Sequence, residues 1–341
     1  MKNIVIIRGP QGCGKSSLVR RLGLDGHHLS FDKIREVVAG DTFNLDGMMT
    51  IPQQHNKLVW SMTQESLKRR MEGGETIVFE ATLPAAQDIK SIMTLARHHD
   101  YAVMIVDFYN TRPAQVIAAD ALRPERSRVG EFKIMRAYEE GWNTELPRHI
   151  TVAYVNDIDD TVSAEVEVTQ FLMRSTKPKI LSSYRRVVHI GDLQGTLHPL
   201  LDPASPLANG IEDDVFYIFC GDLFDRGREN DLVARWWLEN AAGRSNVILV
   251  GGNHEDHVEN AAAGRPSVSR EWTDHTWPQL ETAGITRTDM QTITRQIVPM
   301  IHYNWGGTEV LVTHGGLTKF PTSLHLIPES ILRRGNGHYG H

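Results

Sequence analysis

The loop "GPQGCGKS", directly after the apolar run "NIVIIR", constrains the fold of this chain more than any other feature. It fits the pattern GxxxxGK[ST] and precedes a helical residue pattern. Glycines in such a loop let backbone N–H groups turn toward phosphate oxygens at a helix N-terminus, while the lysine reaches the terminal phosphates and the serine binds Mg²⁺. We therefore expect a strand-loop-helix unit that binds ATP, or another nucleoside triphosphate, with Mg²⁺. The residues assigned to this site are Gly9, Gly12, Gly14, Lys15, Ser16 and Ser17.

The first half of the chain alternates apolar β-branched runs with helical patterns, as in "TIVFEA" before "AQDIKSIMTLARHH". This alternation is typical of a parallel sheet wrapped by helices, an α/β fold. The later segment "RSTKPKILSSYRR" is polar and has no amphipathic period, which is typical of a linker. With 341 residues, the chain is long enough for two domains. We expect a first domain at residues 1–172, a linker at 173–184 and a second domain at 185–341.

The stretch "SFDKIR" follows the next short strand and should lie at the same edge of the sheet as the phosphate loop. Asp32 is placed to take a proton from an acceptor hydroxyl, and Arg35, one helical turn later, to bind an anionic part of that acceptor. The alternative is that Ser30 or Asp32 only caps the following helix. Both interpretations are compatible with the sequence.

The segment "LRPERSRVGEFKIMR" is rich in arginine. A kinase needs mobile arginines that close over the transferring phosphoryl group and spread its charge, and Arg123, Arg126 and Arg128 are the candidates. The alternative is a solvated helix face.

Together these motifs resemble the 5′-OH polynucleotide kinase module of phage and bacterial end-healing enzymes, over about residues 1–150. The resemblance implies that Asp32 is the general base for the 5′-hydroxyl and that Arg35 contacts a backbone phosphate of the acceptor. It also implies that Arg123 or Arg126 closes on the ATP phosphates. In the strand-end motif "FEAT", Glu80 and Thr82 are assigned to substrate binding, although the family more often has Asp there.

The second half contains apolar runs that each end in a polar loop: "VVHIGDLQG", "VFYIFCGDLFDRG", "VILVGGNHE" and "TEVLVTHGG". Oxygen donors mixed with imidazole at the ends of parallel strands suit a pair of divalent ions such as Mn²⁺. Two adjacent ions need a shared carboxylate, for which Asp222 is the natural choice. The alternative for each residue alone is a turn or a helix cap. The assigned metal ligands are Asp192, Gln194, Asp222, Asn253 and His314.

The order of these loops resembles the calcineurin-like binuclear metallophosphoesterases, over about residues 185–320, and implies an α/β sandwich. It implies that Asp192 is a terminal ligand and that Asn253 and His314 bind the second ion. It further implies that His254 protonates the leaving group, that Arg226 holds the phosphate and that Asp225 belongs to the catalytic set. The family usually has His in place of Gln194, and for its further His ligand this chain offers His338 or His341.

Composition limits the partners and the location of the protein. The net charge is −6, so any nucleic acid must bind at a local basic patch. The two cysteines, Cys13 and Cys220, lie in or beside the expected site loops, which makes a disulfide framework improbable. No signal peptide or membrane-spanning stretch is expected. We therefore expect no membrane partner and a cytoplasmic location in a bacterial cell, for a protein of bacterial or phage origin.

A kinase module followed by a phosphoesterase module resembles the polynucleotide kinase-phosphatases. We expect an enzyme that phosphorylates 5′-OH ends and removes 3′-phosphate or 2′,3′-cyclic phosphate, with RNA or DNA ends as substrates and a separate ligase as its partner. One alternative keeps both folds but makes the second half a dinucleoside-polyphosphate hydrolase or a phosphoprotein phosphatase, which Gln194 favours. Another is a metal-poor second domain that binds nucleic-acid ends without catalysis.

Overall fold

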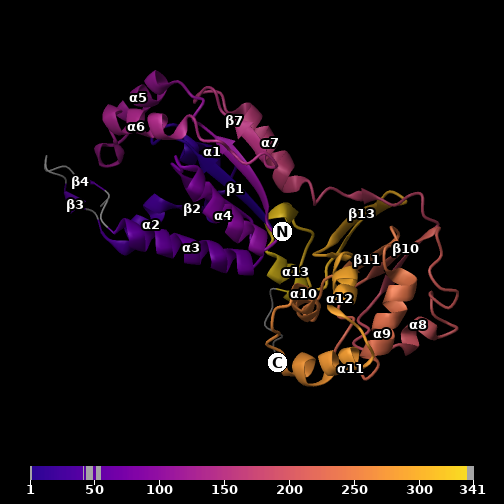
Figure 1. Cartoon of the computed structure of the whole chain (residues 1–341). Coiled ribbons are helices and arrows are strands. Elements are labelled where there is room, and N and C mark those ends of the chain that lie inside the picture. The colour runs from indigo at the N-terminus through magenta and orange to yellow at the C-terminus, as the bar shows by residue number, and fades with distance from the viewer. Residues whose placement is uncertain (1, 41, 44–48, 51–54, 336–341) are drawn as a thin grey trace. The chain divides into compact units, whose positions relative to one another are not determined.

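The computed structural model describes residues 2–40, 42–43, 49–50 and 55–335. The chain forms two compact units (Figure 1). Unit 1 comprises residues 1–175 together with 323–328, and unit 2 comprises residues 176–322 together with 329–341. Among the described residues, no helix has the length and apolar character needed to cross a bilayer.

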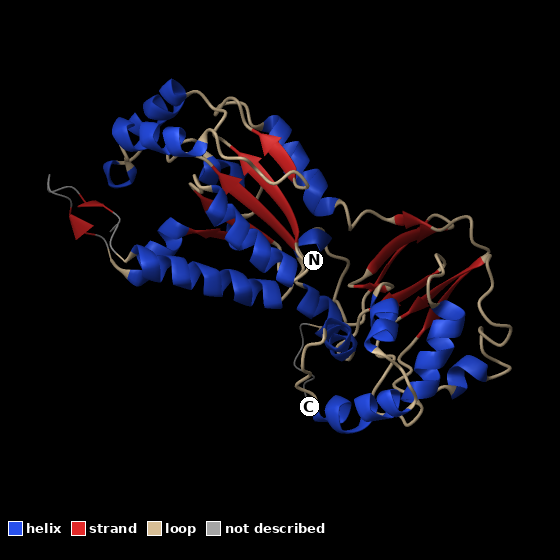
Figure 2. Cartoon of the chain, in the orientation of Figure 1, coloured by secondary structure: helices blue, strands red, loops and turns tan. Residues whose placement is uncertain are grey.

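Unit 1 is built on a parallel five-stranded sheet of order β2-β5-β1-β6-β7 (Figure 2). Its strands are β1 (Asn3–Arg8), β2 (His28–Ser30), β5 (Ile77–Ala81), β6 (Ala102–Asp107) and β7 (Thr151–Tyr154). The short antiparallel pair β3 (Thr42–Phe43) and β4 (Met49–Thr50) is separate from this sheet. The parallel sheet confirms the α/β prediction.

Helices cover both faces of this sheet. Successive residues of a strand point to opposite faces, so Ile4 and Ile6 of β1 pack in one core with α2, α3 and α4. Val5 and Ile7 pack in the other core with α1, α5, α6 and α7. The helices are α1 (Lys15–Arg21), α2 (Phe31–Val38), α3 (Asn56–Glu72), α4 (Ala86–His98), α5 (Pro113–Ala121), α6 (Glu131–Gly141) and α7 (Val162–Met173), with 3₁₀ turns η1 (Asp25–His27), η2 (Glu125–Ser127) and η5 (Leu324–Leu326).

Unit 2 is a sandwich of two sheets. The first is parallel, of order β12-β11-β10-β9, and the second has the order β14-β13-β8. The strands are β8 (Lys179–Ile180), β9 (Arg186–Ile190), β10 (Val215–Phe219), β11 (Val247–Val250), β12 (Ile297–Val298), β13 (Ile301–Trp305) and β14 (Thr308–Val312). The hairpin β13–β14 turns at Gly306 and Gly307, both with positive φ, as the sequence "NWGG" predicts.

The central strand β10 joins the two layers of unit 2. Phe216 and Ile218 face the second sheet, whereas Tyr217 and Phe219 face the helices, and all four are fully buried. The helices are α8 (His198–Leu201), α9 (Asn230–Trp236), α10 (Glu255–Ala263), α11 (Trp277–Thr282), α12 (Arg287–Thr294) and α13 (Glu329–Arg334), with π-helices η3 (Trp237–Ala241) and η4 (Trp272–Thr276). This arrangement confirms the predicted α/β sandwich.

Two segments differ from the expected domain boundaries. The expected linker 173–184 contains β8, which pairs with β13 of the second sheet. Residues 323–328 belong to unit 1, where the Thr76 hydroxyl donates to the His325 carbonyl at 2.6 Å and Leu326 packs against the core. Neither contact is indicated by a sequence pattern. Strand β8 consists of only two exposed residues, which backbone pairing holds in place.

Candidate functional sites

The phosphate loop begins at the carboxyl end of β1, where glycine is sterically required. Gly9 has φ 151°, and a Cβ there would lie 2.5 Å from Cβ of Phe108. Its N–H donates to the carbonyl of Thr82 at 3.3 Å, which ties the loop to the end of β5. Gly14 has φ 93° and caps α1. The backbone therefore adopts the tight turn that a phosphate-binding loop needs.

Lys15 is held inside this loop. Its side chain is buried, and Nζ donates to the carbonyl of Gly9 at 3.0 Å and to that of Pro10 at 2.7 Å. Nζ also lies 3.8 Å from Sγ of Cys13, so its three described hydrogen-bond partners are neutral. Phosphate oxygens would give this buried ammonium a charged partner at hydrogen-bond distance.

Ser16 meets an acidic partner from the neighbouring strand. Its hydroxyl donates to Oε2 of Glu80 at 2.8 Å, and Nε2 of His28 lies 2.9 Å from the same oxygen. Burial acts to raise the pKa of Glu80, but hydrogen bonds from His28 and Ser16 and the charge of Lys15 outweigh it and lower the pKa. An ionised carboxylate beside the serine hydroxyl is a donor set that fits Mg²⁺.

In the segment after β2, Ser30 and not Asp32 caps helix α2. The hydroxyl of Ser30 accepts the N–H of Lys33 at 3.2 Å and caps α2. Asp32 therefore does not serve as the N-cap. Its side chain is 62% exposed, and Oδ1 lies 2.8 Å from Nη1 of Arg35. The pair offers an accessible carboxylate next to a fixed guanidinium.

The arginine-rich segment is organised by Asp120. This buried carboxylate accepts the N–H groups of Val129 and Gly130 at 3.0 Å and lies 3.2 Å from Nη1 of Arg123. Arg128 donates through Nε to the carbonyl of Arg123 at 2.8 Å. The side chain of Arg126 lies outside what the structure describes.

In unit 2, three predicted ligands converge from the loops after β9, β10 and β14. The ligand atoms of Asp192, Asp222 and His314 all lie within 4.8 Å of one another. Nε2 of His314 is 3.6 Å from Oδ2 of Asp222, and its Nδ1 is 2.8 Å from the carbonyl oxygen of Cys220. Two carboxylates and an imidazole oriented by a carbonyl form a donor set that fits a divalent ion.

The two predicted amide ligands lie in the loops after β9 and β11. Nε2 of Gln194 donates to Oδ2 of Asp192 at 3.3 Å, so this side chain is directly beside the carboxylate cluster. Asn253 is half-buried in the loop after β11, next to His254. The N–H of His254 donates to Oδ1 of Asp222 at 3.1 Å, which connects the Asn253 loop to the shared carboxylate.

These loops hold a strained backbone. Of seven non-glycine residues with positive φ in the described part of the chain, four belong to them: Gln194 (47°), Asp222 (50°), Asp225 (73°) and Arg226 (62°). Each such conformation costs about 1–3 kcal/mol and persists where the surroundings enforce it. Here a Cβ on Gly221 would lie 2.5 Å from Nδ1 of His314, so only glycine lets the His314 ring lie this close to the backbone of the loop after β10.

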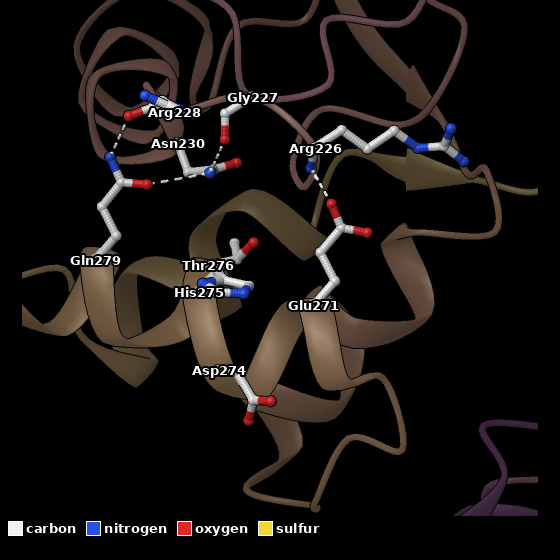
Figure 3. A pocket seen from close by; sticks show the side chains of 9 residues that line it. All are labelled: Arg226, Gly227, Arg228, Asn230, Glu271, Asp274, His275, Thr276 and Gln279. Atoms are coloured by element: carbon white, nitrogen blue, oxygen red, sulfur yellow. Dashed lines mark hydrogen bonds between the residues drawn. The ribbon is translucent and has the colours of Figure 1, made fainter.

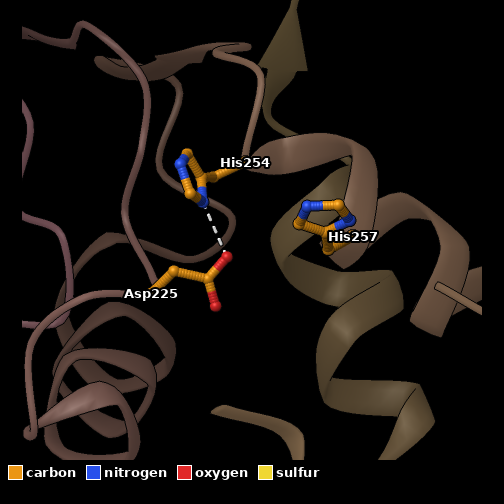
Figure 4. A group of neighbouring side chains, drawn as sticks. All are labelled: Asp225, His254 and His257. Carbon is orange, nitrogen blue, oxygen red and sulfur yellow. Dashed lines mark hydrogen bonds and ion pairs between the residues drawn. The ribbon is translucent and has the colours of Figure 1, made fainter. Parts of the chain in front are cut away.

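Asp225, His254 and His257 form a second cluster (Figure 4). Nδ1 of His254 is 2.6 Å from Oδ2 of the fully buried Asp225, and the ligand atoms of His257 complete the group. The hydrogen bond that His254 donates to Asp225 is the largest contribution to a raised pKa of His254. Burial lowers the pKa of His257. Nε2 of His254 lies 3.9 Å from Oδ2 of Asp222, so the imidazole links the two clusters.

Arg226 is exposed at the edge of a polar pocket of about 490 Å³ (Figure 3). Its N–H donates to the carboxylate of Glu271. The pocket is lined by Arg226, Gly227, Arg228, Asn230, Glu271, Asp274, His275, Thr276 and Gln279. Trp272, on the same segment, is buried and stacks on Trp277 with ring centroids 6.2 Å apart, so its ring belongs to the packing of this segment.

Sequence reasoning did not single out Glu255, although it belongs to the motif "GNHE". Its fully buried carboxylate accepts the N–H groups of Asp222 (2.7 Å), Leu223 (2.9 Å) and Gly252 (2.7 Å). Burial raises its pKa against the effect of these bonds. Glu255 thus joins the loops after β10 and β11. In the sequence, its position directly after His254 could have indicated this role.

Replacing Glu255 with alanine should leave these three buried N–H groups without their partner. We expect the free energy of unfolding to fall by about 2–4 kcal/mol, because each unsatisfied buried donor is costly. Urea unfolding measures this change, and the exposed Glu239→Ala is the matched control. Equal stability of the two variants would show that Glu255 does not hold the loops together.

The candidates His338 and His341 lie outside the described residues.

Comparison with known proteins gives one family match for each unit. Residues 4–140 match a family model described as an AAA domain, and residues 185–335 match one described as a calcineurin-like phosphoesterase. No curated protein matches the chain significantly.

Among solved structures, a sugar kinase from a Janibacter species is 12% identical, with a TM-score of 0.35 and coverage of 50% of this chain and 94% of that chain. Shikimate kinase from Bacteroides thetaiotaomicron is 13% identical, with a TM-score of 0.33 and coverage of 50% and 98%. A chain of the Pnkp1/Rnl/Hen1 RNA repair complex is 16% identical, with a TM-score of 0.36 and coverage of 75% and 73%.

The two family matches cover separate stretches: the first contains the loop around Lys15, and the second contains the loops around Asp192, Asp222 and His314. Residues 4–140 therefore form an AAA-type P-loop domain, and residues 185–335 form a calcineurin-like phosphoesterase domain.

Proposed function

We propose that the protein heals nucleic-acid ends: it phosphorylates 5′-OH ends with ATP and removes 3′-phosphate or 2′,3′-cyclic phosphate. The observation that supports the proposal is that one chain matches an AAA domain, over a stretch with a phosphate-loop motif, and a calcineurin-like phosphoesterase. The first would donate phosphate and the second would remove it. The products of the two reactions, a 5′-phosphate and a 3′-hydroxyl, are the ends that a ligase joins. A separate ligase is therefore the expected partner.

In the kinase reaction, Lys15 would leave the loop carbonyls and bind the terminal phosphates of ATP. Ser16 and Glu80 would hold Mg²⁺, which neutralises charge on the transferring phosphate. Asp32 would accept the proton of the 5′-hydroxyl, and Arg35, 2.8 Å from Asp32, would bind a phosphate of the acceptor strand. Arg123, held by Asp120, would close on the ATP phosphates.

In the phosphoesterase reaction, Asp192, Gln194, Asp222, Asn253 and His314 would hold two divalent ions, for which we propose Mn²⁺. Such ions supply the attacking water and neutralise the phosphate. Arg226 would bind the non-bridging phosphate oxygens. His254, whose pKa Asp225 raises, would protonate the oxygen of the leaving nucleotide.

The role of Asp32 gives a direct test of the acceptor site. Asp32→Asn keeps the shape of the side chain but removes the base, so phosphorylation of a 5′-OH oligonucleotide should slow by about 10²- to 10⁴-fold. Transfer of labelled phosphate from ATP measures the rate, and Asp25→Asn is the matched control. Retention of the full rate would exclude Asp32 as the general base.

The substrate class is tested with the unaltered protein. Labelled ATP is offered with a 5′-OH oligonucleotide, shikimate or gluconate, and the phosphoesterase is offered a 3′-phosphate oligonucleotide or a diadenosine polyphosphate. The proposal predicts turnover of the oligonucleotides. Turnover of only the small molecules would overturn it while leaving both folds intact.

A further inference from the structure

The catalytic carboxylate Asp225 has two partners, and only one of them is part of the proposed reaction. Oδ2 lies 2.6 Å from Nδ1 of His254. Oδ1 accepts a hydrogen bond from the hydroxyl of Thr276, a residue 51 positions later in the chain. Asp225 is 0% and Thr276 is 1% exposed, so water does not compete for this contact. The two bonds together fix the plane of the carboxylate.

Thr276 is itself held rigidly. It ends the π-helix η4, an uncommon element that is frequently found at functional sites. Two polar contacts attach this segment to the loop that carries Asp225: the N–H of Arg226 donates to Glu271, and Nδ2 of Asn230 donates to Oε1 of Gln279 at 3.1 Å. The position of the threonine hydroxyl is therefore set by the fold.

The geometry of His254 depends on this carboxylate. Its Nδ1 is bonded to Asp225, while its Nε2 lies 3.9 Å from Oδ2 of Asp222 in the ligand cluster. A rotation of the Asp225 carboxylate would turn the imidazole away from the leaving oxygen. Asp225 also has φ 73°, a strained backbone conformation that the surrounding contacts must maintain.

We propose that Thr276 is a positioning residue of the phosphoesterase, which orients Asp225 so that His254 can donate its proton to the leaving nucleotide. The inference rests on the proposed role of His254 as proton donor. In the reaction, the P–O bond to the leaving oxygen breaks as the oxygen of a water molecule bonds to phosphorus, and that water releases one proton to the solvent. The proton on Nε2 of His254 passes to the leaving oxygen, and His254 then takes up a proton from the solvent.

The leaving group distinguishes positioning from a structural role. A nucleoside 3′-monophosphate releases an alcohol that needs a proton, whereas p-nitrophenyl phosphate releases a stable phenolate that does not. Thr276→Val removes the hydroxyl at nearly constant volume. We expect kcat for the nucleotide to fall about 10- to 100-fold, as for other residues that orient a catalytic ligand, and kcat for p-nitrophenyl phosphate to stay within about threefold.

Two variants control this measurement. Thr276→Ser keeps the hydroxyl and should retain most activity on both substrates. Thr273→Val lies one turn earlier on the same π-helix, where the side chain is exposed, and should leave both rates unchanged.

An equal loss on both substrates in Thr276→Val would mean that the residue is merely structural, and unchanged rates would mean that the bond is dispensable. Either result overturns the inference. His254→Ala is measured alongside: if it shows no preference between the substrates, the proposed role of His254 fails, and the inference fails with it for that separate reason.

Discussion

Asp222→Asn is expected to reduce phosphoesterase activity on the order of 10³-fold or more, while the kinase rate stays unchanged. Asp222 faces His314 at 3.6 Å and His254 at 3.9 Å, so both residue clusters depend on its charge. Asparagine keeps the shape and can still accept the N–H of His254, which protects the fold. Release of phosphate from a 3′-phosphate oligonucleotide measures the effect.

The control for this variant is Asp213→Asn, whose side chain is 95% exposed and forms an ion pair with Arg244. Binding of Mn²⁺ to both proteins, measured by calorimetry, connects the loss of activity to the ions. Full activity of Asp222→Asn would rule out Asp222 as the shared ligand.

Lys15→Met should reduce the kinase rate on the order of 10³-fold, because the charge that binds the terminal phosphates is lost. This loss is comparable to that expected for the phosphoesterase in Asp222→Asn. Methionine fits the buried site, whose lysine is only 6% exposed, so the fold should persist. ATP-dependent labelling of a 5′-OH oligonucleotide measures the rate. The phosphoesterase should be unaffected.

The exposed Lys90→Met serves as the comparison for Lys15. A kinase rate in Lys15→Met equal to that of Lys90→Met would contradict the assignment of the loop. A parallel loss of both activities would instead mean that the two domains do not act independently.

The sequence predicted what depends on local spacing. The loop that contains Gly9 and Lys15, and the four polar loops that each follow a strand, are short motifs whose meaning does not require knowledge of distant contacts. The alternation of strands and helices likewise predicted both α/β folds. The convergence of Asp192 and Asp222 follows from the rule that parallel strands, here β9 and β10, bring their carboxyl ends to one edge. His314 follows β14 of the second sheet, so its approach to this edge depends on how the two sheets pack.

What the sequence could not predict depends on long-range pairing. Glu80 contacts Ser16 across 64 positions, and Thr276 contacts Asp225 across 51. Neither pair forms a recognisable pattern, because threonine and glutamate are common residues whose roles come only from their partners. Strand β8 was not predicted, because two exposed residues are too few to show an alternation of apolar and polar positions.

The most direct test of the central claim uses one short RNA with a 5′-OH and a 3′-phosphate, incubated with the unaltered protein, ATP, Mg²⁺ and Mn²⁺. Mass spectrometry reads each end separately. We predict the gain of a phosphate at the 5′ end and the loss of one at the 3′ end. Two unchanged ends, in a preparation that still consumes ATP or cleaves a diadenosine polyphosphate, would contradict end healing and assign both domains to small-molecule substrates.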